Sequence, residues 1–305
     1  MAMRQSFETT VAIMREMSTS PSHWNVRRSY SDVAKKLGID EETVRNRIRS
    51  LKESGFLLGW RLIINARVFG KMSSIVVLEL KSEKHNVAIG EVSKIDGIVL
   101  IQSFYGKSLQ LVVFSDNERQ LREQIKAITS VSHGKILTHW NVKLPRCTHE
   151  PKQMDWLILG SLLKDADKRI PEIADGLRVS AKTVKRRINL MVNSSAFFIQ
   201  PVLDLNKVAG ALPCQLLFIS SERKKSAIDN FIMSSFERIV FCLTDSPTHS
   251  IFNIICSNLA EAKSIEQRVR NQVGVSLARI EIIEGLTYVY DWMAKEITTR
   301  ASGHI

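Results

Sequence analysis

The sequence lacks the residue patterns that are typical of zinc centres, disulfide frameworks and membrane spans. Its 305 residues include four cysteines, at 147, 214, 242 and 256, and none of them forms a Cys-x-x-Cys pair. This spacing excludes the common zinc motifs and a disulfide framework. No apolar run approaches the roughly 20 residues of a membrane span, and residues 1–7 lack the apolar core of a signal peptide. We therefore expect a cytoplasmic protein with no metal, no cofactor and no membrane partner.

Motifs of common catalytic sites are missing as well. The sequence contains no phosphate-binding Gly-rich loop, no His-Glu-x-x-His and no recognisable Ser–His–Asp arrangement. These absences lead us to expect that the chain is not an enzyme.

The chain does have an excess of positive charge, and this charge is concentrated. The formal net charge is +12. Residues 1–70 hold 12 Lys and Arg against 7 Asp and Glu, and residues 152–210 hold 10 against 6. An excess of this size favours an anionic partner such as a nucleic acid.

The two basic stretches are copies of one another. The run Val44-Arg45-Asn46-Arg47-Ile48 recurs as Val184-Lys185-Arg186-Arg187-Ile188, 140 positions later. The shift of 140 positions also relates residues on both sides of the run. Tyr30, Val33, Ala34, Leu37, Thr43 and Gly70 correspond to Ile170, Ile173, Ala174, Leu177, Thr183 and Gly210. A repeat this long is a duplicated pair of domains and not a solenoid unit.

Each copy begins with a pattern typical of a winged helix-turn-helix. In the first copy we expect helices at 7–17, 30–37 and 41–54 and a hairpin wing at 56–64. Gly38 suits the left-handed turn after the second helix, and Asp40 can cap the third. The second copy has helices at 155–163, 171–177 and 181–192, followed by a wing at 197–203. Arg178 replaces the turn glycine there, and since arginine disfavours positive φ, we expect the second turn to differ.

A second domain type follows each winged helix. Strands at 74–80, 98–104, 109–114 and 136–144 alternate with helices at 86–95 and 118–128, which gives the β-α-β-β-α-β order of a ferredoxin-like domain. The second copy repeats this order, and a tail at 287–297 has helical spacing. The predicted fold class is α+β. Its segments are winged helix one (1–70), ferredoxin-like domain one (71–145), a linker (146–153), winged helix two (154–210) and ferredoxin-like domain two (211–305).

The third helix of each winged unit carries the candidate site. Its apolar residues turn inward, so helical geometry turns its basic and polar residues outward. Arginine and asparagine can contact base edges in the major groove, and Lys and Arg bind phosphate. The candidate DNA-binding residues are Thr43, Arg45, Asn46, Arg47, Arg49, Ser50, Lys182, Thr183, Lys185, Arg186 and Arg187.

These residues give the chain a resemblance to the Lrp/AsnC family of transcription regulators. The matching segments are 30–39 and 43–48 with Glu53-Ser54-Gly55, and 154–210 in the second copy. The resemblance implies a DNA-binding winged helix and a ferredoxin-like (RAM-type) domain that dimerises and binds amino-acid effectors. The family's Gly-x-x-Asp turn is Gly106-Lys107-Ser108-Leu109 here, and Ser246-Pro247-Thr248-His249 in the second copy. An amino-acid effector at these turns is therefore not favoured.

The function we expect is sequence-specific regulation of transcription through two DNA-reading helices on one chain. The partners are double-stranded DNA and a small-molecule effector of unknown identity. The two ferredoxin-like domains are expected to pair within the chain as a pseudo-dimer, and further homo-oligomers stay open. Two alternatives remain. One is a chromosome-architectural protein with little sequence preference. The other is an enzyme like the haem-pathway decarboxylases that resemble this fold, with His133, His139 and His249 as candidate residues.

Overall fold

The chain folds into two compact units, and each of them combines segments from both sequence copies. We describe it from a computed structural model, which places residues 9–10, 12–13, 16–17, 29–82, 85–204, 207 and 211–303. Of the described residues, one unit takes those from 9 to 58 together with 203–285, and the other takes 59–202 together with 286–303. Each unit is therefore discontinuous in the sequence. No helix among the described residues is long and apolar enough to span a membrane.

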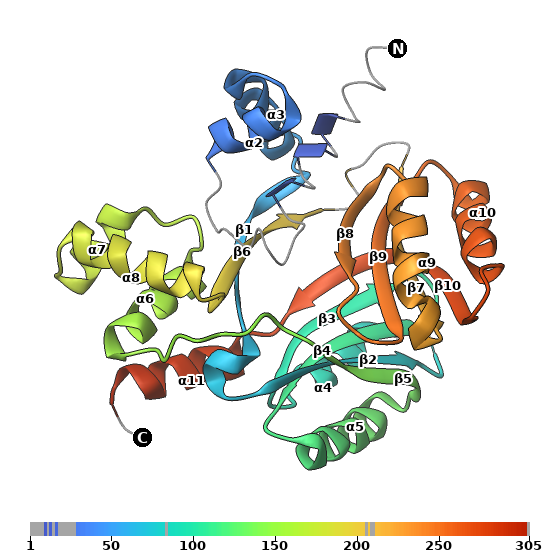
Figure 1. The fold of residues 1–305 in the computed structure, drawn as a ribbon. Helices are drawn as coiled ribbons and strands as arrows, with labels where there is room; N and C mark the ends of the chain where they lie inside the picture. Colours follow the sequence, from blue (N-terminus) through green and yellow to red (C-terminus); the bar gives the residue numbers. More distant parts are fainter. Residues whose placement is uncertain are drawn as a thin grey trace. The chain divides into compact units, whose positions relative to one another are not determined.

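The first unit contains the two described helices of winged unit one and a ferredoxin-like domain. Helices α2 (Tyr30–Leu37) and α3 (Glu41–Glu53) are separated by Gly38, whose φ of 67° closes the tight turn. The sheet comprises β7 (Leu212–Ser220), β8 (Ile239–Leu243), β9 (His249–Cys256) and β10 (Val275–Tyr288), in the antiparallel order β10-β7-β9-β8. Helices α9 (Glu222–Ser235) and α10 (Leu259–Arg270) pack on one face of it, where Ile228, Ile232 and Ile265 are buried (Figure 1).

The second unit contains the other ferredoxin-like domain. Strands β2 (Met72–Glu79), β3 (Ile98–Phe104), β4 (Ser108–Ser115) and β5 (Lys135–Val142) follow the order β5-β2-β4-β3, the same topology as in the first unit. Helices α4 (His85–Val92) and α5 (Glu118–Ser132) cover one face. Both domains have the expected β-α-β-β-α-β order, so the predicted α+β fold class is confirmed.

The second winged helix also belongs to this unit, and its wing strand pairs with the wing strand of the first copy. Helices α6 (Gln153–Lys164), α7 (Ile170–Leu177) and α8 (Ala181–Asn193) lead into β6 (Phe197–Leu203). Strand β1 (Leu57–Ile64) runs straight through the region where we expected a hairpin, and it pairs with β6 in a two-stranded sheet. The hairpin prediction at 56–64 was wrong, because the hydrogen-bonding partner of β1 comes from the other sequence copy.

Two further segments complete the core of this unit. The 3₁₀ helix η2 (Ala66–Phe69) follows β1, and α11 (Asp291–Ala301) is the C-terminal helix. Helix α11 begins four residues later than the helical tail expected at 287–297, because β10 extends to Tyr288. Residues of β1, η2, α6, α7, α8 and α11 form one continuous apolar cluster together with Phe114. This cluster fixes α8, which carries half of the candidate site.

The turn before α8 has the same backbone conformation as the turn before α3. Arg178 takes a φ of 54° and a ψ of 44°, close to the 67° and 31° of Gly38. The expectation that arginine would give a different turn was therefore wrong, because Arg178 adopts the left-handed conformation. A non-glycine residue pays roughly 1–2 kcal/mol for this conformation.

This backbone cost predicts the outcome of two matched substitutions. Arg178→Gly should raise the free energy of unfolding by about 1 kcal/mol relative to Arg178→Ala. Both variants lose the charge, so their difference isolates the backbone. The reverse change, Gly38→Ala, should be destabilising although nothing lies within 4 Å of the added Cβ. Urea unfolding followed by circular dichroism measures these differences, and equal stability of the two Arg178 variants would contradict the prediction.

Candidate nucleic-acid interface

The third helix of each winged unit starts with the same capping arrangement. In α3 the Thr43 N–H donates to Asp40 Oδ1 at 2.6 Å, and the Thr43 hydroxyl donates to Asp40 Oδ2 at 2.7 Å. Both hydrogen bonds lower the pKa of Asp40, and the bond from the Thr43 hydroxyl has the larger effect. In α8 the Thr183 N–H donates to Ser180 Oγ at 3.1 Å, and the two hydroxyls lie 2.9 Å apart. Thr43 and Thr183, both predicted as DNA contacts, therefore have their hydroxyls engaged in helix caps.

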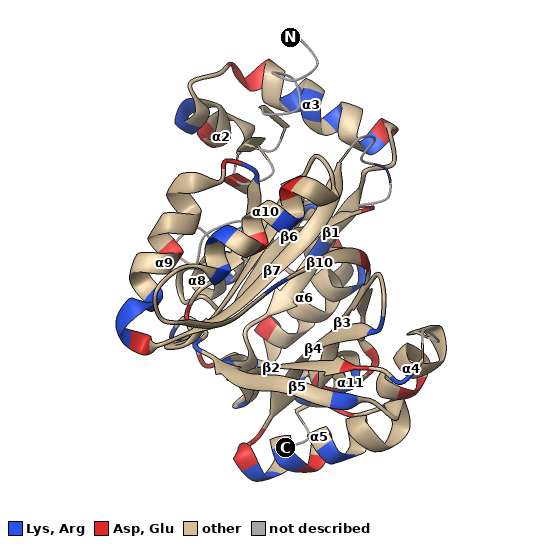
Figure 2. Cartoon of the chain, turned by 90° about the vertical axis from the view of Figure 1, so that its right-hand side faces the viewer, with Lys and Arg blue, Asp and Glu red and all other residues tan. Residues whose placement is uncertain are grey.

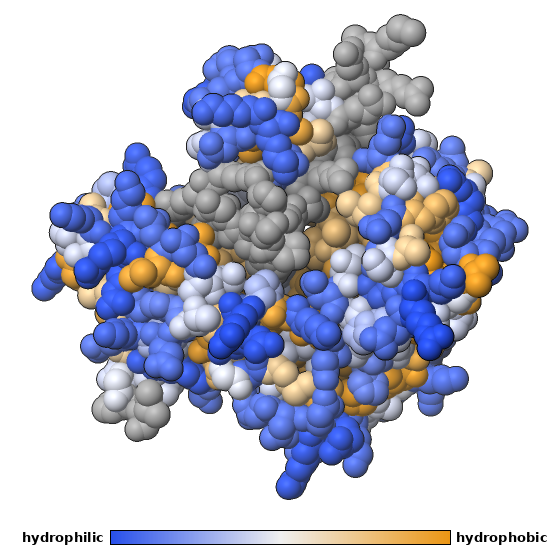
Figure 3. Space-filling view, in the orientation of Figure 1, coloured by the Kyte–Doolittle hydropathy of each residue, from blue (hydrophilic) through white to orange (hydrophobic). Residues whose placement is uncertain are grey.

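Beyond the caps, the two helices expose equivalent positions to solvent. The inward residues Val44, Ile48, Val184 and Ile188 are buried. Seven predicted site residues are exposed: Arg45, Asn46, Arg49, Ser50, Lys182, Lys185 and Arg186. Figure 2 shows Lys and Arg along α3, and in Figure 3 the surface over α2 and α3 is mainly hydrophilic. Each helix thus places its predicted polar residues on one accessible face.

The two helices differ in their balance of charge. Helix α3 has four basic and three acidic residues, a net charge of +1, whereas α8 has four basic residues and no acidic one. Arg45 forms ion pairs with Glu41, Nη2 to Oε1 at 2.6 Å, and with Glu42 at 3.5 Å. Among the described residues, Lys182, Lys185 and Arg186 have no acidic partner. Helix α8 is therefore the stronger local source of positive potential.

The flanking arginines of the two helices also differ. Arg187 is half-buried, and its Nη1 lies 3.5 Å from Oδ2 of Asp155 on α6. Arg47 occupies the equivalent position in α3, and no acidic partner for it is found in the described part of the chain. The sequence reading did not single out Asp155, although this residue is the one acidic residue of helix α6. Asp155, as the single acidic residue of that helix, was the feature of the sequence that could have indicated a partner for Arg187.

The turn expected at an effector site is closed by its own side chains in the second copy. The His249 N–H donates to Ser246 Oγ at 3.1 Å, and Thr248 Oγ1 lies 2.9 Å from His249 Nδ1. These local contacts use the polar groups of the turn itself. The effector stays a prediction.

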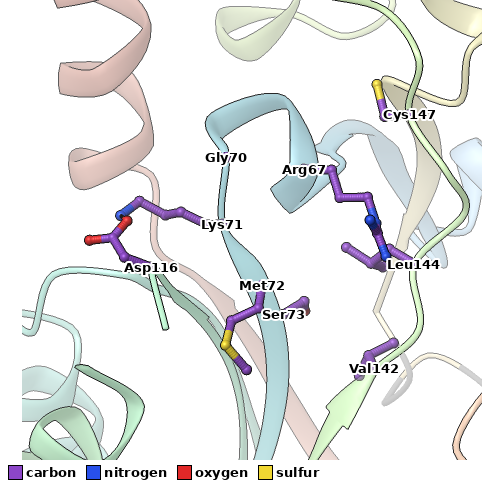
Figure 4. Close-up of a pocket in the computed structure, with 9 residues that line it drawn as sticks. All are labelled: Arg67, Gly70, Lys71, Met72, Ser73, Asp116, Val142, Leu144 and Cys147. Carbon is purple, nitrogen blue, oxygen red and sulfur yellow. Dashed lines mark hydrogen bonds and ion pairs between the residues drawn. The ribbon is translucent and has the colours of Figure 1, made fainter. Parts of the chain in front are cut away.

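A cavity of about 470 Å³ lies elsewhere in the second unit (Figure 4). It is lined by Arg67, Gly70, Lys71, Met72, Ser73, Asp116, Val142, Leu144 and Cys147. Lys71 Nζ pairs with Asp116 Oδ1 at 2.5 Å, and Figure 4 shows this pair on the opposite side of β2 from Arg67. The cavity adjoins the segment that leads from β5 toward α6.

The histidines considered for an enzyme occupy separate local settings. His133 ends α5 with a φ of 52° and is exposed, as is His139 on β5. His249 is half-buried at the start of β9. Within the described ranges, no group of three or more His, Cys, Asp or Glu side chains is placed to hold a metal ion.

Comparison with known proteins finds relatives among regulators. No protein-family model matches the chain. The HTH-type transcriptional regulator Ptr1 of Methanocaldococcus jannaschii is 29% identical over 118 residues, which are 37% of this chain and 80% of Ptr1. LrpA of Pyrococcus horikoshii, another HTH-type transcriptional regulator, is 34% identical over 61 residues, covering 20% of this chain and 43% of LrpA. The resemblance to Lrp-type regulators is confirmed.

A solved structure matches nearly the whole chain and corrects one expectation. The siroheme decarboxylase NirDL aligns with a TM-score of 0.56 over 97% of this chain and 98% of its own, at 13% identity. At this identity the match shows the fold alone. The expectation that this Lrp-like chain is not an enzyme is nevertheless contradicted, because an enzyme is built on the same whole-chain fold. Paired winged helices therefore do not exclude catalysis.

Proposed function

We propose that this Lrp-like chain is a DNA-binding transcription regulator that reads double-stranded DNA through α3 and α8. The observation that carries the proposal is the repeated exposure pattern: two capped helices present basic side chains at equivalent positions 140 residues apart. An α-helix fits the major groove, where exposed Arg and Asn side chains can contact base edges and Lys and Arg can bind phosphate. The similarity to Ptr1 and LrpA supports this proposal.

The two helices should prefer different DNA sequences. Helix α3 offers Arg45 and Asn46, and these side chains can pair with guanine and adenine respectively. Helix α8 offers Lys185 and Arg186 without acidic neighbours on the helix. Its binding should depend more on phosphate charge and less on base identity. An architectural protein with little preference is the alternative, and it would show no consensus after selection from random duplexes.

One chain should supply both DNA-reading helices, α3 as the first head and α8 as the second head. Strand β1 from the first copy pairs with β6 from the second, so one chain already provides two strands that follow two winged helices. Covalent linkage removes the bimolecular cost of bringing two such units together. The proposal is therefore a pseudo-dimer, and a duplex with both half-sites should be saturated by one chain. Saturation at two chains per duplex would instead indicate a homodimer with one working head per chain.

The first prediction from this function concerns salt. Basic side chains that neutralise phosphates release counterions, so log affinity should fall linearly with log salt by about 0.9 per phosphate contacted. Fluorescence anisotropy with a labelled duplex, chosen by selection from random sequence, measures this slope. An affinity that stays constant from low to physiological salt would exclude DNA as the charge-matched partner.

The second prediction separates the two heads. Arg45→Ala with Asn46→Ala should weaken binding at one half-site, and Lys185→Ala with Arg186→Ala should do so at the other. A lost base contact typically costs about 1–3 kcal/mol. Duplexes with one half-site scrambled show which head each pair serves. Equal effects of both pairs on both half-sites would contradict the assignment of one head to each half-site.

A second candidate function is chemistry on an iron tetrapyrrole. The whole-chain fold match to NirDL favours it, and that enzyme has also been solved with an iron-uroporphyrin III analogue. Titration of the chain with iron-uroporphyrin III should then shift the Soret band with saturation at one equivalent, and mass spectrometry should detect loss of CO₂ from siroheme. His249→Ala is the informative variant, since His133 and His139 are exposed. An unchanged spectrum at micromolar concentration would remove this candidate.

A further inference from the structure

A buried carboxylate connects the linker with two helices of the second winged helix. Asp155 lies in the first turn of α6 with its side chain fully buried. Its Oδ2 accepts a hydrogen bond from the Lys152 N–H at 2.9 Å and lies 3.0 Å from His149 Nε2 and 3.5 Å from Arg187 Nη1. Its Oδ1 has no hydrogen-bond partner among the described groups. The linker, α6 and α8 therefore meet at one oxygen atom.

Such a carboxylate constrains whatever surrounds it. Removing one partner from a buried charge is strongly destabilising, because the remaining charge stays desolvated. Arg187 is the one partner contributed by α8, and its side chain is only 18% exposed. Its neighbours Lys185 and Arg186 are exposed on the same helix. The contact with Asp155 thus restricts how α8 rotates and slides along α6, and this sets the direction in which Lys185 and Arg186 point.

We infer that Asp155 and Arg187 are positioning residues for the second head and that Arg187 does not contact DNA. This inference rests on the proposed DNA-binding function. It removes Arg187 from the DNA-binding set and adds Asp155 as a residue that acts through α8. His149 brings the linker to the same carboxylate, so the linker is part of the support of this head. Helix α3 provides the natural comparison, because Arg47 has no such acidic partner in the described structure.

The test uses the full chain and distinguishes a direct contact between Arg187 and DNA from a role of Arg187 in positioning α8. Salt slopes are measured for Arg187→Ala, Arg186→Ala and Arg47→Ala, and amide hydrogen exchange is measured in the same proteins without DNA. Arg187→Ala should weaken DNA binding without changing the salt slope, and exchange across α8 should become about tenfold faster, equivalent to about 1.4 kcal/mol. Arg186→Ala and Arg47→Ala should each reduce the slope by about 0.9 and leave helix exchange unchanged.

Two milder variants guard against simple misfolding. Arg187→Lys keeps the charge and should recover part of the slow exchange and of the affinity. Asp155→Asn keeps the shape and should resemble Arg187→Ala. A slope reduced by Arg187→Ala with unchanged α8 exchange would make Arg187 a DNA contact and overturn the inference, as would wild-type behaviour in both measurements. If the wild-type chain binds no DNA, the proposed function fails, while the exchange data still decide whether Asp155 and Arg187 hold α8.

Discussion

The second winged helix depends on an apolar core that it does not build alone. Trp156 of α6 packs against Phe69 of η2 with ring centroids 5.5 Å apart, and Phe69 also contacts Trp292 of α11 at 5.4 Å. Trp292 reaches Phe114 of β4 at 6.2 Å, and the Arg300 guanidinium lies 5.2 Å from the Trp156 ring. Aromatic side chains bury large apolar areas and dominate core energetics. Three segments far apart in the sequence, η2, β4 and α11, therefore hold α6, and α6 in turn holds α8.

This shared core explains why the sequence copies do not fold as separate modules. Strand β1 connects α3 to η2, so its apolar residues Leu62 and Ile64 belong to the core of the second winged helix. Arg61 on the same strand stacks on Tyr288, with its guanidinium carbon 3.3 Å from the ring centroid. Burial lowers the pKa of Arg61 and raises the pKa of Tyr288. Contacts between distant segments therefore decide where each wing strand goes.

The features that were predictable from the sequence are those that depend on local order. The spacing of Val44 and Ile48, repeated at Val184 and Ile188, was sufficient to give both helix faces, because periodicity in a helix needs no tertiary information. The pairing of β1 with β6 was not predictable, since the sequence pattern of a strand does not specify which other strand it pairs with. Arg178 shows a third case, in which packing of α7 and α8 overrides a residue preference worth roughly 1–2 kcal/mol. The contact of Asp155 with Arg187 spans 32 positions and needed the folded structure.

The same architecture is compatible with two functions, DNA binding and enzymatic catalysis. The folds of this chain and of a decarboxylase align over nearly their full lengths, so the fold gives no preference. Of the candidate histidines, His133 and His139 lie exposed to solvent and His249 is half-buried. By contrast, the basic residues of α3 and α8 are aligned on accessible helix faces, and α8 has no acidic residue that would neutralise them. The exposed basic side chains that the proposed DNA binding requires are therefore present on both helices.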